Sequence, residues 1–477
     1  MNVLNLQLFE LAGLIASGDI TSRQATEASI AQALGPGSAL NAFIALDAEG
    51  ALDQADMLDR HRASGKPLGP LHGVPLAHKD MFYRTGQVST CGSDLRRDYH
   101  ASTTATVLTR LDEAGAVTIG RLNMAEFALN PTGHNPHFGD CRNPWSHQHC
   151  PGGSSSGSGA AVAGRVVYGA LGSDTGGSVR IPSSMCGLTG IKGTYGRVSR
   201  FGVMPLSFTY DCIGPLTRSA RDCARMLKVV AGYDDLDSTS AQEPVADYEA
   251  NLDGDLRGVR IGYSSSAFVE NLDPDVARAY QDALLLLESR GAILLAIDTP
   301  SLDAISTYSA IVQRCEMASI HARWMRSAPE NYAAHVSGRI YAGYGIPAVA
   351  YIEALSQRGN LVRQFCQEVF SQVGALVLPT LPTNVPTLEE ANLDSDSPET
   401  EARFGALTEN TRPFNYLGLP AMSVPCGMDR RGLPIGLQII GRPFAEHALL
   451  KLAAAYQQDT RWHLLSPSET SAPYQGI

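Results

Sequence analysis

The sequence predicts an α/β fold, because segments typical of strands alternate with segments typical of helices along much of the chain. The amphipathic stretch 103–114 predicts a helix, and the apolar run 116–119 predicts the strand that follows it. Between 259 and 297 a strand, a helix and a second strand are predicted in turn. Gly115 and Gly291 follow the helices of the two units as stop signals.

The two ends of the chain complete this pattern. Helical spacing of Leu11 and Ile15, together with a capping box formed by Thr21 and Gln24, predicts that the first 65 residues form a helical layer packed on the core. Residues 300–370 read as mostly helical, and the proline-rich, acidic segment 381–399 reads as a surface loop. A β-hairpin is expected near the end, with strands 422–425 and 435–440 on either side of a turn at 429–432.

The segment 151–182 carries the strongest chemical signal. Glycines in the run 174–178 allow successive N–H groups to converge on one point, so that Ser178 would carry its own oxyanion hole. The same segment contains the apolar runs 160–163 and 166–171, which predict a buried helix and then a buried strand. These runs argue against a flexible Gly/Ser linker.

A lysine ends a second apolar segment upstream. The run 74–77 reads as a short strand that leads into His78 and Lys79. Burial of an ammonium group lowers its pKa, and a neutral amine can then act as a general base. Lys79 is therefore a candidate base, although a solvated surface lysine would give the same local sequence.

Together these segments resemble the amidase signature family over nearly the whole chain. The matching motifs are Gly73-Val74-Pro75 before Lys79, Gly152-Gly153-Ser154-Ser155, Gly172-Ser173-Asp174-Thr175-Gly176-Gly177-Ser178-Val179-Arg180-Ile181-Pro182, Tyr195-Gly196-Arg197-Val198-Ser199, Asn415-Tyr416-Leu417-Gly418-Leu419-Pro420 and Gly432-Leu433-Pro434-Ile435-Gly436-Leu437-Gln438. The resemblance implies one large α/β/α layered domain, 1–477, with a central mixed β-sheet. Within it we expect a helical layer at 1–65, a signature core at 66–230, a variable pocket region at 231–410 and a return to the core at 411–477.

The resemblance also implies a role for each residue of the site. Ser178 would be the nucleophile, Ser154, following a cis peptide bond, would relay the proton, and Lys79 would accept it. The oxyanion would bind the N–H groups of Thr175, Gly176, Gly177 and Ser178, with Ser155, Asp174 and Arg180 as supports. No metal and no cofactor are expected.

The expected function is hydrolysis of a small carboxamide to a carboxylate and ammonia or an amine. Within the family, two alternatives are the glutamine-hydrolysing A subunit of a glutamyl- or aspartyl-tRNA amidotransferase and a hydrolase of ureido acids related to allophanate or carboxybiuret. Thr408 falls where the A subunit has an acidic residue for the amino group of glutamine, whereas Arg363 or Arg412 could face a carboxylate. The other candidate wall residues are Tyr308, Cys315 and Trp324. A catalytically idle binding scaffold is the alternative from another class.

Other site readings remain for the same residues. Gly153 to Gly157 match the G-x-S-x-G nucleophile elbow, which would make Ser155 the nucleophile but requires a strand directly before it. Four neighbouring side chains could bind zinc, although their spacing fits no common zinc motif: Cys141, His147, His149 and Cys150. The run 157–159 begins like a dinucleotide fingerprint but lacks its third glycine.

Composition limits the remaining possibilities. The chain has 477 residues, a net charge of −11 and nine cysteines. The acidic balance argues against direct nucleic-acid binding, and the odd number of dispersed cysteines favours reduced thiols. No apolar run approaches the roughly 20 residues of a membrane span, and the amino terminus lacks a signal-peptide pattern. We expect a cytoplasmic protein, with a homodimer as an open alternative to a monomer.

Overall fold

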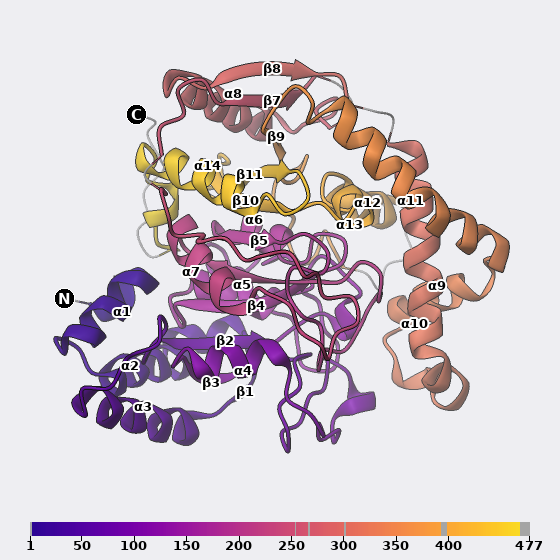
Figure 1. Ribbon diagram of the computed structural model, residues 1–477. Helices are drawn as coiled ribbons and strands as arrows, with labels where there is room; N and C mark the ends of the chain where they lie inside the picture. The colour runs from indigo at the N-terminus through magenta and orange to yellow at the C-terminus, as the bar shows by residue number, and fades with distance from the viewer. Residues whose placement is uncertain (1, 253, 266–267, 300–301, 393–397, 468–477) are drawn as a thin grey trace.

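The computed structural model describes residues 2–252, 254–265, 268–299, 302–392 and 398–467. Its strands form one mixed, 11-stranded sheet in the order β1-β3-β2-β4-β6-β5-β10-β11-β9-β7-β8, which runs through the middle of the molecule (Figure 1). The strands are β1 (Phe43–Leu46), β2 (Pro75–Lys79), β3 (Val117–Leu122), β4 (Gly169–Asp174), β5 (Thr189–Lys192), β6 (Cys212–Thr217), β7 (Arg260–Ser264), β8 (Ile293–Ile297), β9 (Ala375–Pro379), β10 (Ala421–Met428) and β11 (Pro434–Gly441).

Helices cover both faces of this sheet and extend beyond one side of it. Figure 1 shows three long helices, α9 to α11, standing together at the side of the molecule away from the amino terminus. The α-helices are α1 (Leu8–Ser17), α2 (Ser22–Leu34), α3 (Ala48–Ala63), α4 (Thr106–Glu113), α5 (Ser156–Ala163), α6 (Arg180–Cys186), α7 (Ala220–Val230), α8 (Pro274–Ser289), α9 (Asp303–Ser327), α10 (Ala334–Tyr344), α11 (Ala348–Glu368), α12 (Pro398–Glu409), α13 (Pro413–Tyr416) and α14 (Glu446–Gln458).

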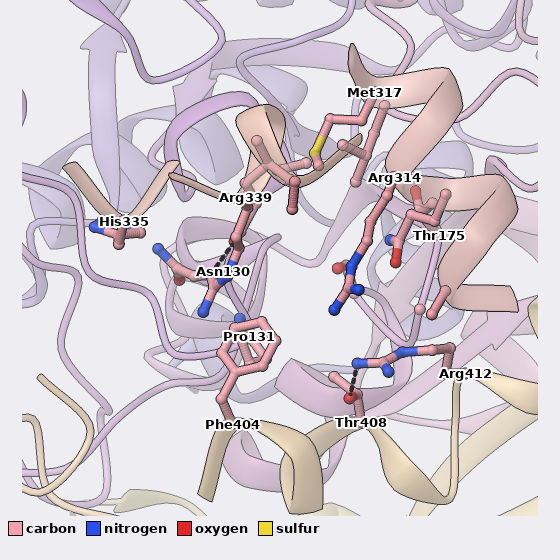
Figure 2. Close-up of a pocket in the computed structure, with 18 of the residues that line it drawn as sticks. Asn130, Pro131, Thr175, Arg314, Met317, His335, Arg339, Phe404, Thr408 and Arg412 are labelled. Atoms are coloured by element: carbon pink, nitrogen blue, oxygen red, sulfur yellow. Dashed lines mark hydrogen bonds between the residues drawn. The ribbon is translucent and has the colours of Figure 1, made fainter. Parts of the chain in front are cut away.

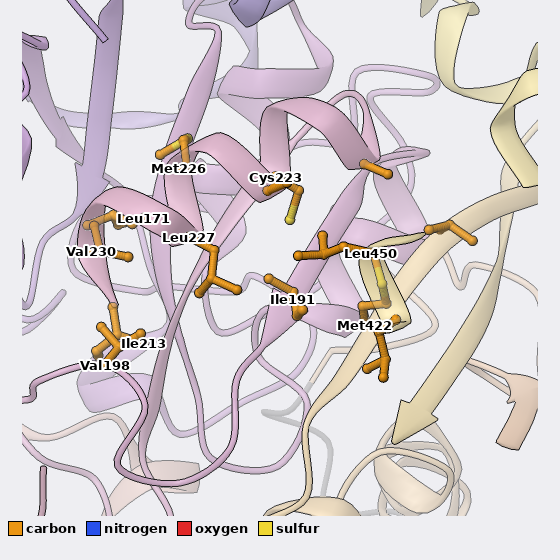
Figure 3. Packing of buried hydrophobic residues seen from close by; sticks show 14 of the residues in the cluster. Leu171, Ile191, Val198, Ile213, Cys223, Met226, Leu227, Val230, Met422 and Leu450 are labelled. Carbon is orange, nitrogen blue, oxygen red and sulfur yellow. The ribbon is translucent and has the colours of Figure 1, made fainter. Parts of the chain in front are cut away.

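Apolar packing fixes the central strands from one face. Helix α7 packs Cys223, Met226 and Leu227 into one apolar cluster with Ile191 of β5 and Ile213 of β6 (Figure 3). All five side chains are at most 1% exposed. Full burial of a Leu, Ile or Met side chain contributes about 1.5–3 kcal/mol to stability. On the other face, the buried alanines of α5 and its Val162 belong to a separate apolar cluster with α2 and α3. The strands that lead to the site are therefore held on both faces.

Sheet pairing brings two of the predicted motifs together at the carboxyl ends of two neighbouring strands. Strand β2 pairs in parallel with β4, so that the carboxyl ends of both strands point the same way. Lys79 is the last residue of β2, and Asp174 is the last residue of β4. Side chains at the carboxyl ends of neighbouring parallel strands commonly form ligand sites.

Most of the expected elements are confirmed. The unit between 259 and 297 is β7, α8 and β8, and the expected hairpin is β10 and β11, which pair antiparallel. The region 300–370 is mostly α9, α10 and α11. Part of the expected loop 381–399, residues 393–397, lies outside the described residues.

Two expectations are wrong in detail. The first 65 residues are not only helical, because the short apolar run Phe43–Leu46 forms β1 and pairs antiparallel with β3 at the edge of the sheet. A four-residue strand gives too little alternation to be recognised without its partner. The strand predicted at 166–171 instead spans Gly169–Asp174, because the turn after α5 continues through Val166.

Among the described residues no helix combines the length and apolar character that a bilayer crossing requires. All nine cysteines lie in described segments and all are free thiols.

Candidate active site

Lys79 is buried at the end of β2 and contacts two serine hydroxyls. Its Nζ lies 2.7 Å from Oγ of Ser154 and 2.9 Å from Oγ of Ser173, and its side chain has no solvent exposure. Burial lowers the pKa of Lys79 from 10.5 to about 7, although the carboxylates of Asp211 and Asp174 act in the opposite direction. A large fraction of this amine is therefore neutral near pH 7 and able to accept a proton from a hydroxyl.

Ser154 is presented to Lys79 by a tightly packed turn before α5. The peptide bond between Gly153 and Ser154 is cis. Helix α5 then starts at Ser156, and a Cβ at Gly157 would lie 2.3 Å from the carbonyl oxygen of Ala42. Only glycine allows this approach, which explains the small residues of the motif. They serve close packing rather than linker flexibility.

Asp174 organises the loop that follows β4. Its carboxylate accepts hydrogen bonds from the backbone N–H groups of Gly177 at 2.9 Å and Val179 at 3.2 Å. It also pairs with the guanidinium of Arg180, with distances of 3.0 and 2.9 Å, and accepts from the amide of Asn415 at 2.8 Å. Burial alone would raise the pKa of Asp174, but the Arg180 guanidinium and the hydrogen bonds hold this pKa well below its usual range. The buried ion pair braces the loop.

The backbone amides of the loop divide into two groups. The N–H of Gly177 donates to Asp174, so it already has an acceptor. The N–H groups of Thr175, Gly176 and Ser178 have no acceptor within the described part of the chain. Three of the four predicted oxyanion donors are therefore available for a ligand atom, and Gly177 instead shapes the loop through its φ of 128°.

Neighbouring side chains hold this loop in place. Thr175 donates its hydroxyl to Asp211 at 2.5 Å, and Thr411 donates its hydroxyl to the carbonyl of Gly176 at 2.6 Å. A Cβ at Gly177 would lie 2.3 Å from the hydroxyl oxygen of Thr411, which excludes larger residues there. The loop is thus fixed from two sides before any ligand binds.

A cavity of about 680 Å³ opens beside this loop. Figure 2 shows Arg314 from α9 and Arg412, at the start of α13, pointing into it, with Arg339 of α10 on the opposite side near Phe404. Its wall consists of Ala128, Leu129, Asn130, Pro131, Thr175, Gly176, Ser178, Ile181, Leu206, Ala310, Gln313, Arg314, Met317, Ala334, His335, Gly338, Arg339, Ala342, Phe404, Gly405, Thr408 and Arg412. Ser178 and its two neighbouring N–H donors therefore face a space large enough for a small molecule.

Several candidate wall residues lie elsewhere. Arg363 is exposed on α11 and bonds to Asn360, and Tyr308 donates to Glu353 on the surface. Trp324 stacks against a buried aromatic cluster at Phe127, and neither it nor Cys315 lines the cavity. Of the expected wall residues only Arg412 and Thr408 line it, joined by a hydrogen bond from the guanidinium to the hydroxyl.

Three site residues are not identified by sequence reasoning alone. Ser173 lies beside Lys79 because β4 pairs with β2, a pairing that no local motif reveals. Arg314 and Arg339 come from helices in the variable region, where the only available signal is their basic character.

The structure does not favour the other readings of these residues. Ser155 exchanges 3.3 Å hydrogen bonds with the backbone of Ser173, and no strand precedes it in the fully described segment 123–155. His149 bonds to the hydroxyl of Ser146, and the thiol of Cys150 to the carbonyl of Thr387. Within the described residues, no three His, Cys, Asp or Glu side chains are grouped so as to hold a metal ion.

Comparison with known proteins identifies the family of this chain. The amidase family model matches residues 24–450. The A subunit of glutamyl-tRNA(Gln) amidotransferase from Geobacter metallireducens is 37% identical over 487 aligned positions, covering 97% of this chain and 99% of that protein. The protein of the same name from Myxococcus xanthus is 40% identical, covering 96% of this chain and 98% of that protein.

Solved structures show the same fold. One comes from a vestigial protein complex described as revealing the origins of an s-triazine catabolic enzyme, with a TM-score of 0.88 and 31% identity over 95% of this chain and 98% of that one. Another is 6-aminohexanoate cyclic dimer hydrolase with its substrate, with a TM-score of 0.88 and 27% identity over 97% of this chain and 99% of that one. The fold, the site and these relatives together indicate a hydrolase of amide C–N bonds, and the chain belongs to the amidase signature family.

Proposed function

We propose that this chain hydrolyses a small carboxamide to a carboxylate and ammonia or an amine through an acyl-enzyme on Ser178. The observation that carries the proposal is the 2.7 Å contact between the fully buried Nζ of Lys79 and the hydroxyl of Ser154. A buried, partly neutral amine held against a hydroxyl is the arrangement that a serine nucleophile needs for activation.

In the first half-reaction the hydroxyl oxygen of Ser178 attacks the carbonyl carbon of the amide. Its proton passes to Ser154, whose own proton passes to Nζ of Lys79. The developing oxyanion accepts hydrogen bonds from the N–H groups of Thr175, Gly176 and Ser178, and each such donor is typically worth about 2.7–4 kcal/mol in the transition state.

The tetrahedral intermediate then collapses. Lys79 returns its proton through Ser154 to the leaving nitrogen, the C–N bond breaks, and the amine departs. In the second half-reaction a water molecule attacks the acyl carbon and loses a proton along the same path, and Ser178 leaves as its hydroxyl. Asp174 and Arg180 hold the donors in place throughout without exchanging protons.

Two measurements test this proposal. A panel of aliphatic, aryl and ureido amides and glutamine should be offered to the purified protein and to Ser178→Ala. Mass mapping after a sulfonyl fluoride should find the label on Ser178. Label on Ser155 alone, or undiminished turnover by the alanine variant, would refute the mechanism.

A second candidate is the glutaminase activity of an amidotransferase A subunit. The observation in its favour is the 37–40% identity to proteins of that name over nearly the whole chain. Against it, Thr408 takes the place expected for an acidic residue that binds the amino group of glutamine, and its hydroxyl accepts a hydrogen bond from Arg412. Hydrolysis of glutamine alone among the panel, stimulated by partner subunits, would favour this second function.

A further inference from the structure

The charges of the cavity wall have one sign. Arg314, Arg339 and Arg412 line the cavity, and among the described residues of the wall none is acidic. The protein as a whole is acidic, with a net charge of −11. The guanidinium groups therefore make the cavity locally positive in an acidic protein, and such a cavity favours an anionic ligand.

Two of these arginines face each other without a carboxylate between them. Figure 2 shows Arg314 and Arg412 pointing toward the same part of the cavity from adjacent walls. Burial lowers the pKa of Arg412, and the charge of Arg314 lowers it further. The side chain of Arg314 has no hydrogen bond or ion pair with another described residue, and among the described residues the guanidinium of Arg412 donates only to the hydroxyl of Thr408. The fold therefore holds two positive charges near each other although they repel.

The acidic residue of α9 nearest in sequence to Arg314 is Glu316, and its carboxylate is occupied by other hydrogen bonds. Glu316 is buried and accepts hydrogen bonds from the hydroxyls of Ser207 and Thr209, at 2.5 and 2.8 Å, and from Tyr351 at 3.0 Å. These contacts tie α9 to the loop after β5, and Glu316 does not line the cavity. The third arginine is also engaged, since Arg339 donates to the carbonyl of Leu129 at 2.8 Å.

The arginine pair lies close to the reacting centre. A Cβ at Gly176 would lie 4.0 Å from Cγ of Arg412, so this side chain starts beside the oxyanion donors. A group bound by Arg412 while a carbonyl carbon sits at Ser178 must be joined to that carbon by a short chain of a few atoms.

We propose that the substrate is a short amido acid whose carboxylate binds between Arg314 and Arg412 while its amide carbon sits at Ser178. Guanidinium groups match a carboxylate through paired hydrogen bonds, and the described residues of the wall offer no acidic partner for an ammonium group. The inference rests on the proposed function for the position of the amide, and it adds the class of substrate: an acid without an amino group.

Binding to an inactive protein tests the inference separately from turnover. Ser178→Ala should be titrated by calorimetry with succinamate, with neutral succinamide and with inorganic phosphate. Succinamate is expected to bind roughly 10- to 100-fold more tightly than succinamide, as expected for hydrogen bonds to a charged group. Adding Arg314→Gln or Arg412→Gln should weaken succinamate binding roughly 10- to 100-fold and so remove that preference.

The control is Arg363→Gln, which removes an exposed arginine outside the cavity and should leave the preference intact. Equal binding of acid and neutral amide, no binding of either at millimolar concentration, or a preference that survives both arginine changes would overturn the inference. Phosphate binding as tight as that of succinamate would mean a general anion site and would also overturn it. Since these outcomes do not involve turnover, they leave the role of Ser178 to the labelling and activity measurements.

Discussion

Replacing Lys79 with methionine should make the protein inactive and change how its stability depends on pH. The pKa of this amine is about 7 in the fold and 10.5 when unfolded. Because the folded pKa is the lower one, the unfolded chain binds more protons between these two values, and the stability of the wild type rises with pH in that window. Methionine fills a similar volume and has no such proton to lose.

The size of the effect follows from the two pKa values. Holding Lys79 in the fold costs about 4 kcal/mol at pH 7 and about 1 kcal/mol at pH 10, at 1.36 kcal/mol per unit of pKa. The hydrogen bonds to Ser154 and Ser173 oppose this cost by about 1 kcal/mol each at both pH values. We therefore expect Lys79→Met to be the more stable protein at pH 7, and the wild type to gain about 3 kcal/mol on the variant by pH 10.

Urea unfolding of both proteins at pH 7, 8.5 and 10 measures this difference, and the exposed Lys66→Met is the matched control, whose pH dependence should follow the wild type. The same amine should appear in catalysis: kcat/KM of the wild type is expected to fall tenfold per pH unit below about 7 and to level off above it. A stability difference that stays constant from pH 7 to 10 would refute the argument that burial depresses this pKa.

Three further substitutions test residues that hold the site in place. Asp174→Asn leaves the buried guanidinium of Arg180 without its counter-charge, so we expect a loss of about 3–5 kcal/mol in urea unfolding and a fall in kcat. Ser155→Ala removes only 3.3 Å hydrogen bonds to the β4 backbone, and kcat should stay within about threefold of the wild type because each such bond contributes about 1 kcal/mol or less. Glu316→Gln weakens the link between α9 and Ser207, so KM should rise about tenfold, with kcat nearly unchanged, if α9 positions substrate.

The chemistry of the site can be predicted further than its surroundings. The motif 174–178 and Lys79 each carry a local signature, because glycine freedom and an apolar approach act within a few residues of the chain. The α/β class also follows from local periodicity, and the hairpin of β10 and β11 is predictable for the same reason. What depends on pairing between distant strands is not predicted, including β1 and the contact of Ser173 with Lys79.

The local sequence does not predict which backbone N–H groups shape the loop and which face the cavity. A glycine-rich run predicts that N–H groups converge, but not which acceptor each will find. The carboxylate of Asp174 lies within reach of Gly177, and this one hydrogen bond separates the donor that shapes the loop from the donors that face the cavity. The distinction needs the three-dimensional positions of both groups.

The site contains two kinds of basic side chain, a buried lysine beside the cavity and arginines in its wall, and neither kind can replace the other. An ammonium group buried among hydroxyls can lose its proton, and Lys79, with a pKa of about 7, is suited to moving one. A guanidinium remains charged even where burial lowers its pKa, as at Arg412, so it can hold an anion but cannot act as a base. The ion pair of Asp174 with Arg180 carries no net charge, so it braces the loop without adding to the positive wall. Proton transfer and anion recognition can therefore operate side by side in one small site.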